Sequence, residues 1–264
     1  MTVLPPASVL VAFGLSGDPE PLPGGEGRAV RVGRAVLKPV DGREEAEWCA
    51  GLFDRLPPSV SFRVPRPIKA DSGTYVVDGW TASELVPGRP CPDGRWASLL
   101  AVGRAFHEAL RAVPRPDLLD RRAHPWAIAD RVAWQEEDVT LRGDAAPLLA
   151  ALRPLLTPVA APAQLVHGDL TGNVLFHRGS PPAVIDFSPY WRPAGYAEAI
   201  VVADALLHHG AGPDLVDALG EEGPELLARA LVFRLVALAL LVEKPTPDDL
   251  APFAAITRLA RSRL

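Results

Sequence analysis

Apolar residues in the first third of the chain recur at spacings that predict short strands and one helix. Residues 8–13, 28–32 and 35–40 form strand-like runs, separated by turns rich in glycine and proline. Residues 42–56 instead show the period of an amphipathic helix. Residues 74–80 predict a further strand. This region is therefore expected to be a small sheet with one helix.

From residue 95 onward the pattern changes to that of amphipathic helices. Helices are predicted over residues 95–113, 124–138 and 146–156, and again from Tyr196 to the end. A short group of strands, residues 164–187, interrupts them.

The two patterns predict an α+β protein with two lobes, joined near Val86-Pro87-Gly88. Residues 1–86 would form the small lobe and residues 87–264 the larger, mainly helical lobe. A cleft between two lobes is a usual place for a ligand.

The most apolar segment, residues 226–242, predicts a core helix. Arg229 and Arg234 interrupt it, and a bilayer-spanning helix needs about 20 apolar residues. The N-terminus lacks a basic start and contains Pro5 and Pro6, unlike a secretory signal. We therefore expect a cytoplasmic protein that does not enter a membrane.

Composition narrows the class of partner. The 264 residues carry 27 basic and 32 acidic side chains, a formal net charge of −5, which argues against binding nucleic acid by phosphate neutralisation. Cys49 and Cys91 make neither a disulfide framework nor a zinc site. Only three of the basic residues are lysines, Lys38, Lys69 and Lys244, so a lysine at any position needs a reason.

Polar side chains gather in residues 167–173, His-Gly-Asp-Leu-Thr-Gly-Asn, and again at Asp186. Apolar runs flank both segments, so short strands are expected to carry Asp169, Asn173 and Asp186 at their ends or in the loop between them. Carboxylate and amide oxygens suit Mg²⁺. Phosphoryl transfer uses one carboxylate to orient a hydroxyl and metal ligands to hold nucleotide phosphates. The alternative is an ordinary turn that Asp169 caps.

The segment HGDLTGNVLF, followed by VIDF, resembles the catalytic loop and metal-binding strand end of the aminoglycoside phosphotransferase family, relatives of the protein kinases. The order of the other elements also resembles that family, over most of the chain. The resemblance implies a protein-kinase-like fold, ATP and Mg²⁺ as cofactors, and a small-molecule hydroxyl acceptor. It implies that Asp169 is the catalytic aspartate and that Asn173 and Asp186 hold magnesium.

The loop departs from the family pattern in its length. Asn173 follows Asp169 by four residues, where the family usually has five. The separation of 13 between Asn173 and Asp186 resembles the usual one, so the shortening lies inside the loop and concerns the placement of Asp169. Ser188 stands where protein kinases carry a glycine.

A site of this type needs a lysine on a small-lobe strand, paired with a glutamate of the next helix. Lys38 is the lysine embedded in a strand-like run, and its ammonium could bridge phosphates and a carboxylate. Glu45 continues the apolar face of the predicted helix, so we expect it to pair with Lys38. Glu47 is the second choice, on a face expected to be solvated.

Backbone groups are expected to supply the other nucleotide contacts. Residues 83–86 resemble the family's hinge, so Glu84 and Val86 would hold the adenine. Gly24-Gly25-Glu26-Gly27 could bring amides close to phosphates, although a simple turn is the favoured interpretation.

The sequence defines the acceptor less well. Residues 188–193 could border its pocket or pack as ordinary aromatics. The acidic residues between positions 212 and 227 could receive a polycation, but a solvated surface is favoured. His107 is expected in the core. Asp204 is expected to accept hydrogen bonds from the catalytic-loop backbone, with Glu198 as a competing candidate.

The leading hypothesis is an ATP-dependent phosphotransferase that moves the γ-phosphate to a hydroxyl of a small molecule, such as an aminoglycoside-like or other amino or sugar alcohol. The shortened loop motivates an alternative, a relative that binds nucleotide or a small ligand without turnover. A metal-dependent phosphoesterase is a third class, but Val174 stands where its Asn-His element needs a histidine.

Overall fold

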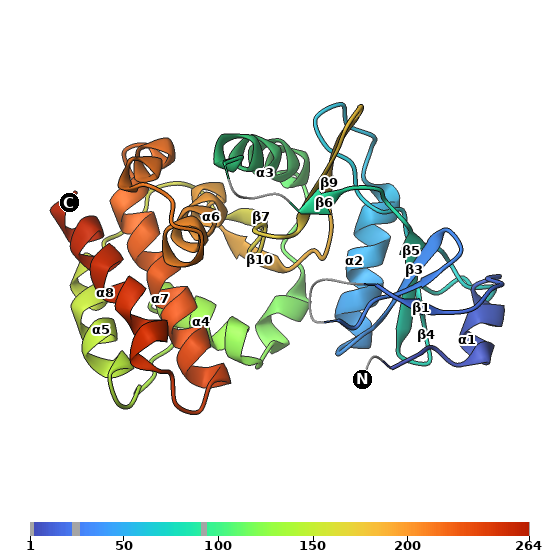
Figure 1. Cartoon of the computed structure of the whole chain (residues 1–264), viewed down its shortest axis with the longest axis horizontal. Helices are drawn as coiled ribbons and strands as arrows, with labels where there is room; N and C mark the ends of the chain where they lie inside the picture. Colours follow the sequence, from blue (N-terminus) through green and yellow to red (C-terminus); the bar gives the residue numbers. More distant parts are fainter. Residues whose placement is uncertain (1–2, 23–26, 91–93, 264) are drawn as a thin grey trace. The chain divides into compact units, whose positions relative to one another are not determined.

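The chain divides into two compact units. The computed structural model describes residues 3–22, 27–90 and 94–263 (Figure 1). The N-terminal unit consists of Met1–Cys91 with Gly172–Phe187, and the C-terminal unit of Pro92–Thr171 with Ser188–Leu264. The predicted boundary between residues 86 and 87 is different, since the N-terminal unit extends to residue 91 and also includes residues 172–187. In this unit β6 (Arg89–Pro90) pairs with β8 (Val174–His177).

Two antiparallel sheets form the N-terminal unit. The larger sheet has the strand order β1-β2-β3-β5-β4, and the smaller one has the order β6-β8-β9. The helix α2 lies alongside the larger sheet (Figure 1). The remaining bounds are α1 (Ala7–Ala12), β1 (Glu20–Pro21), β2 (Val30–Val32), β3 (Ala35–Pro39), α2 (Arg43–Arg55), β4 (Val76–Val77), β5 (Trp80–Glu84) and β9 (Ser180–Val184).

Alternating side chains explain why this sheet forms. Val30 and Val32 of β2, and Ala35 and Leu37 of β3, are buried on one face, as a period of two requires. The predicted strands over residues 28–32 and 35–40 and the predicted helix over residues 42–56 are thus confirmed, with slightly shorter bounds.

Two predictions for this unit were wrong. Residues 8–13 were expected to be a strand, but residues 8–12 belong to helix α1. Val9 of this helix and its C-cap residue Phe13, four positions apart, pack into the core of the sheet. A short continuous apolar run has no period that separates strand from helix. The expected strand over residues 74–80 is instead β4, a turn and the start of β5. Asp78 and Gly79 make that turn with positive φ angles of 47° and 77°.

Helices dominate the C-terminal unit. Its helices are α3 (Trp96–Leu110), η1 (Asp117–Arg121), α4 (Pro125–Ala133), α5 (Ala145–Leu152), η2 (Arg153–Leu155), α6 (Ala194–His208), η3 (Pro213–Leu219), α7 (Gly223–Leu241) and α8 (Pro247–Ser262). Its two strands, β7 (Gln164–His167) and β10 (Pro189–Arg192), pair antiparallel. The strands expected over residues 164–187 are therefore present, but β7 belongs to the C-terminal unit and β8 and β9 to the N-terminal unit. Strand β10 was not predicted.

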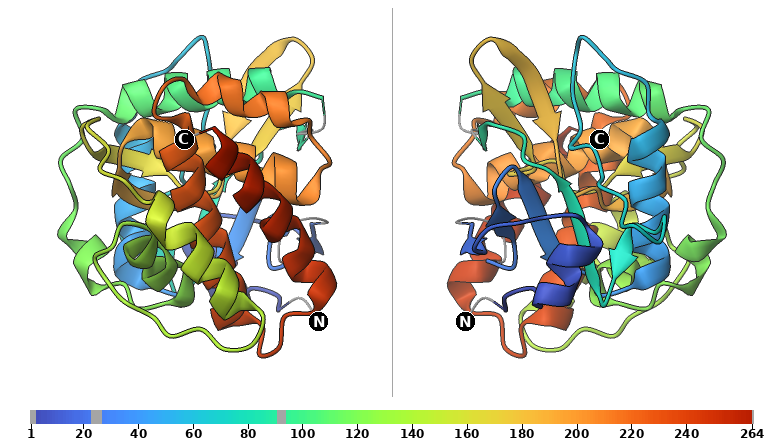
Figure 2. Two further views of the ribbon diagram at one scale, coloured as in Figure 1. Left: turned by 90° about the vertical axis from the view of Figure 1, so that its left-hand side faces the viewer. Right: turned by 90° about the vertical axis from the view of Figure 1, so that its right-hand side faces the viewer.

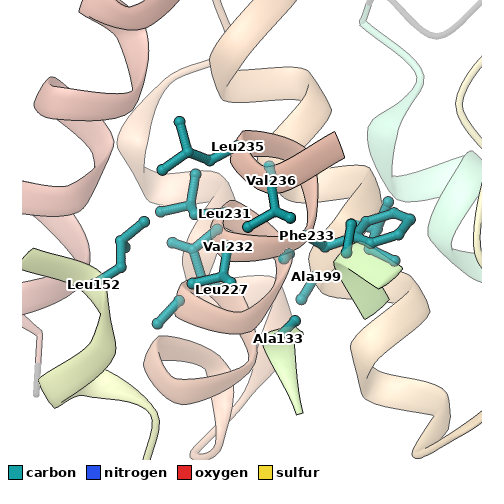
Figure 3. Close-up of a cluster of buried hydrophobic side chains, with 14 of the residues drawn as sticks. Ala133, Leu152, Ala199, Leu227, Leu231, Val232, Phe233, Leu235 and Val236 are labelled. Carbon is teal, nitrogen blue, oxygen red and sulfur yellow. The ribbon is translucent and has the colours of Figure 1, made fainter. Parts of the chain in front are cut away.

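The helix α7 forms the centre of the C-terminal unit. Figure 3 shows its apolar side chains meeting Ala133 of α4, Leu152 of α5 and Ala199 of α6. The helices α5, α7 and α8 lie side by side in the left view of Figure 2. The prediction of a core helix over residues 226–242 is confirmed. Within the described ranges, no helix is both long and apolar enough to cross a membrane.

Arg229 shows how α7 carries a charge inside the core. Its side chain donates to the carbonyl oxygens of Ala133, at 2.7 Å, and Thr157, at 2.6 Å, and its guanidinium lies 4.4 Å from the ring centre of Trp134. Burial lowers the pKa of Arg229. Ala133 is the last residue of α4, where the helix dipole favours a cation.

Truncating a side chain in the buried middle of α7 should destabilise the protein far more than truncating one at its more exposed C-terminal end. Leu231 is fully buried, so Leu231→Ala should lower the free energy of unfolding by about 2–5 kcal/mol. Leu240→Ala, in the same helix but at a partly exposed position, should change it by about 0.5 kcal/mol or less. Urea unfolding followed by circular dichroism measures both, and equal losses would contradict a core built around α7.

Candidate active site

The N-terminal unit brings together two of the predicted site residues, 148 positions apart in the chain. Lys38 lies on β3, and Asp186 lies two residues after the end of β9. The Lys38 Nζ atom forms an ion pair with Asp186 Oδ1. The two side chains are 36% and 40% exposed, so the pair remains open to solvent. A lysine on a central strand thus meets the carboxylate predicted to bind metal.

The backbone of Asp186 has an uncommon conformation. Its φ angle is +52°, in the left-handed region that few residues other than glycine adopt. Aspartate and asparagine tolerate this region, and such strained positions cluster at functional sites. The next residue, Phe187, stacks on Phe53 of α2 with ring centres 5.6 Å apart. The turn that carries Asp186 is therefore anchored to the helix that follows Lys38.

Asn173 lies at the same end of the β8–β9 hairpin as Asp186. Val174 pairs with Val184, and one position further the Ile185 N–H donates to the Asn173 carbonyl oxygen at 2.9 Å. An amide and a carboxylate fit Mg²⁺, which commonly takes one or two protein carboxylates and completes its shell with phosphates and water. The described residues contain no group of three or more His, Cys, Asp or Glu side chains that could hold a metal.

The two glutamates considered as partners of Lys38 have different environments. Both carboxylate oxygens of Glu47 accept backbone N–H groups of the β4 segment, from Tyr75 and Val76, each at 3.0 Å. Glu47 is thus engaged in holding β4 to α2. It is half-buried and not solvated as expected, although Asp54 and Arg55 on the same face are exposed. Glu45 is half-buried on the same helix and remains the proposed partner.

The predicted hinge lies where β5 ends. Glu84 is the last residue of β5 and its N–H donates to the Arg66 carbonyl oxygen at 2.8 Å. The Leu85 N–H donates to the Arg34 carbonyl oxygen at 2.8 Å, so strand-like pairing continues to the residue before Val86. Residues 24–26 of the predicted glycine-rich turn lie outside the described residues, as does Cys91, and Cys49 is a half-buried thiol of α2.

The His-Gly-Asp segment follows β7 in the C-terminal unit. His167 is fully buried, and its Nδ1 accepts the Asp169 N–H at 3.1 Å. Gly168 has no room for a side chain, because a Cβ there would lie 2.4 Å from the Tyr190 ring of β10. The Gly168 N–H donates to the Ser188 carbonyl oxygen at 3.0 Å. Packing and hydrogen bonds therefore fix the backbone on which Asp169 stands.

The side chain of Asp169 is held by an arginine that the sequence analysis did not assign to the site. Arg234 of α7 donates from Nη2 to Asp169 Oδ1 at 2.8 Å and forms two further hydrogen bonds with Asp204 of α6. Burial opposes the charge of Arg234, but the two carboxylates outweigh it and raise the pKa of Arg234. Asp204, expected to accept from the catalytic-loop backbone, instead has this guanidinium as its partner, because a buried carboxylate is best matched by a cation.

A second arginine network braces β10. Arg192 forms ion pairs with Asp130 of α4, at 2.7 Å, and with Glu136, at 2.5 Å. Arg122 lies 4.9 Å from the ring centre of Tyr190 and donates to the Pro189 carbonyl oxygen at 2.5 Å. These contacts support the packing alternative for residues 188–193.

The remaining candidates have structural partners. Glu198 pairs with Arg104 at 2.5 Å. In the acidic segment, Asp217 pairs with Arg263, and Glu222 accepts the Ala160 N–H at 3.0 Å. These contacts support the interpretation of that segment as surface structure.

Solved structures define the class of the fold. An aminoglycoside phosphotransferase from Alicyclobacillus acidocaldarius has a TM-score of 0.58 at 15% identity, covering 100% of this chain and 94% of that one. The choline kinase LicA from Streptococcus pneumoniae has a TM-score of 0.64 at 10% identity, covering 97% of each chain. LicA in complex with AMP has a TM-score of 0.54 at 11% identity, covering 93% of this chain and 92% of that one. The predicted α+β, protein-kinase-like fold is confirmed.

The sequence itself defines the family. The profile of the Phosphotransferase enzyme family (APH) matches residues 24–191, more than half of the chain. The chain therefore belongs to this family, and the predicted family is confirmed. Among curated protein sequences, none is significantly similar to the chain.

The support of His167 by His107 should make stability depend on pH. His107 is 1% exposed, as expected of a core histidine, and its Nε2 accepts the His167 N–H at 3.0 Å. Burial, with a smaller effect of His167, lowers the pKa of His107 to about 3. Between about pH 6.5 and 3, His107 is therefore protonated in the unfolded chain, where its pKa is near 6.5, and neutral in the folded chain. The stabilisation is complete above that range and is lost as the pH falls.

His107→Gln keeps an acceptor for the His167 N–H but removes this titration. Between pH 6.5 and 4.5 the wild type should lose about 2 kcal/mol more unfolding free energy than the variant, since one pH unit corresponds to about 1.4 kcal/mol per proton. Urea unfolding at both pH values gives the difference. Equal losses would show that His107 is not held neutral.

Proposed function

We propose that the protein is an ATP-dependent phosphotransferase that transfers the γ-phosphate to a hydroxyl group of a small molecule. The observation that carries the proposal is the ion pair of Lys38 with Asp186, together with the position of Asn173 at the same hairpin end. Kinase-type phosphoryl transfer requires such a lysine and such metal ligands. Family membership supports the same reaction type.

In this proposal the N-terminal unit binds the nucleotide. Lys38 contacts the phosphates, with Glu45 as its partner, and the backbone of Glu84 and Val86 holds the adenine. Asn173 and Asp186 hold Mg²⁺, which would neutralise charge on the transferring phosphoryl group when bound. The AMP in a LicA structure of similar fold supports an adenine nucleotide.

In the C-terminal unit, Asp169 would orient the acceptor hydroxyl and take its proton. Its carboxylate is 44% exposed, so a small molecule can reach it. The names of the similar structures support an acceptor that is an amino or sugar alcohol, as in aminoglycosides and choline. The second candidate, nucleotide binding without turnover, is favoured only by the loop that is one residue short.

A nucleotide and acceptor screen tests the proposal. Mg-ATP should raise the melting temperature, and at least one aminoglycoside, amino alcohol or sugar should increase ADP release. Asp169→Asn should lower kcat by about 10²–10⁴-fold, the usual contribution of a general base, and leave the Mg-ATP stabilisation intact. Asp186→Asn should abolish both the turnover and the stabilisation by Mg-ATP.

Asp217→Asn, which alters an exposed carboxylate paired with Arg263, is the matched control and should behave as wild type. The proposal fails if Mg-ATP gives no stabilisation and Asp186→Asn matches this control. Mg-ATP binding without ADP release for any acceptor would favour the binding-only alternative.

Comparing two lysines of the N-terminal unit distinguishes a direct phosphate contact of Lys38 from the general effect of removing a positive charge. Lys38→Met should weaken Mg-ATP binding at least about tenfold, or 1.4 kcal/mol, measured by calorimetric titration. Lys69→Met removes a lysine that pairs with Asp54 at 3.1 Å and should leave the affinity unchanged. Lys38→Arg should not restore binding, since a planar guanidinium replaces a compact ammonium. Equal affinities of the two methionine variants would exclude Lys38 from the phosphate site.

A further inference from the structure

Arg234 is placed in α7 so that one guanidinium meets two carboxylates. Its side chain is 11% exposed, in an otherwise apolar part of the helix. The Nε and Nη2 atoms donate to the two oxygens of Asp204, at 2.7 and 2.6 Å. Nη2 also donates to Asp169 Oδ1 at 2.8 Å. A bidentate pair of this kind fixes orientation as well as distance.

The orientation of Arg234 is set by groups other than Asp169. Asp204 is 4% exposed, on the buried helix α6. The guanidinium carbon also lies 5.4 Å from the ring centre of Trp126 and 5.2 Å from that of Phe233, within the range of cation–π contacts. A rigid carboxylate and two rings therefore hold the donor in place, and Asp169 meets a donor that is already oriented.

The charge balance suits a catalytic carboxylate. An arginine paired with Asp169 alone would cancel its charge, whereas here Asp204 shares the same guanidinium. One cation and two carboxylates leave the group of three with a formal charge of −1. Asp169 is thus held in position while the cluster stays attractive to the partial positive charge of a hydroxyl hydrogen.

We propose that Arg234 is a positioning residue for phosphoryl transfer, which sets the orientation of the Asp169 carboxylate toward the acceptor hydroxyl and is itself set by Asp204. This inference rests on the proposed function, in which Asp169 orients the acceptor. Arg234 acts through Asp169 and has no contact with the nucleotide in this scheme. Its loss should therefore lower kcat and leave nucleotide affinity unchanged.

The same helix supplies a matched control. Arg229 is also buried in α7, five residues before Arg234, but its guanidinium donates to the backbone carbonyls of Ala133 and Thr157. Arg229→Met and Arg234→Met each remove a buried arginine from one helix, so both should lower the melting temperature. Only Arg234→Met also removes a hydrogen bond to Asp169.

The experiment measures kcat, the KM for Mg-ATP and the melting temperature for wild type and three variants, at a temperature where all are folded. Arg234→Met should lower kcat about 100-fold, the scale of a misplaced catalytic group, with an unchanged KM for Mg-ATP. Arg229→Met should keep the wild-type kcat. Arg234→Lys retains the charge but cannot bond both carboxylates as a fork, so it should recover part of the lost kcat.

The possible outcomes distinguish a purely structural role of Arg234 from a failure of the proposed function. If wild type turns over an acceptor and both methionine variants have the same kcat, Arg234 is only structural and the inference is overturned. If wild type itself binds no nucleotide or turns over no acceptor in the panel, the proposed function fails and the inference fails with it. If Arg234→Met instead raises the KM for Mg-ATP at constant kcat, a positioning role through Asp169 is also excluded.

Discussion

A helix that is buried on every side can carry a charge only where its neighbours neutralise that charge. The helix α7 is such a helix, and it contains two arginines. An unpaired buried charge costs several kcal/mol, so each arginine dictates what must pack against it. Arg229 is met by the carbonyl oxygens of Ala133, at the end of α4, and Thr157, and Arg234 by the Asp204 carboxylate of α6. The packing of the C-terminal unit around α7 therefore follows from charge as much as from apolar area.

The same constraint reaches the loop that carries Asp169. Arg234 is fixed between Asp204 and two aromatic rings, and its Nη2 atom, which already donates to Asp204, also donates to Asp169 on the loop. The buried core of the unit thus determines the orientation of a side chain that is 44% exposed. A side chain is held most precisely when the residues that support it are themselves fixed by packing and hydrogen bonds.

In the N-terminal unit, strand pairing performs the corresponding task. Hydrogen bonding along β8 and β9 sets Asn173 opposite Ile185, and the left-handed backbone of Asp186 then starts a turn whose Phe187 ring stacks on Phe53. Lys38 is fixed separately, by the pairing of β3 with β5. Its ion pair with Asp186 joins β3 of the larger sheet to the turn that follows β9 of the smaller sheet.

Much of this arrangement could be predicted because its causes are local. The alternation in β2 and β3, the apolar run of α7 and the spacing of Asn173 and Asp186 are all visible in the sequence. The role of Arg234 could not be predicted from the sequence. An arginine in an apolar helix shows that a partner must exist, but it does not show which residue is that partner. Glu47 was misjudged for a similar reason, since its partners are backbone N–H groups of Tyr75 and Val76, and backbone donors leave no trace in the residue types.

The loop between Asp169 and Asn173 is one residue shorter than is usual in the family, which raises the question of how Asp169 is held in place. A missing residue would matter if the position of Asp169 depended on the length of the loop after it. Its backbone N–H is instead bound by His167, before the loop, and its side chain by Arg234. Within the loop, Leu170 is 1% exposed and Gly172 has a φ angle of +82°, a conformation that lets the chain turn in fewer residues. Both of these contacts lie outside the shortened part, so the position of Asp169 does not depend on the length of the loop alone.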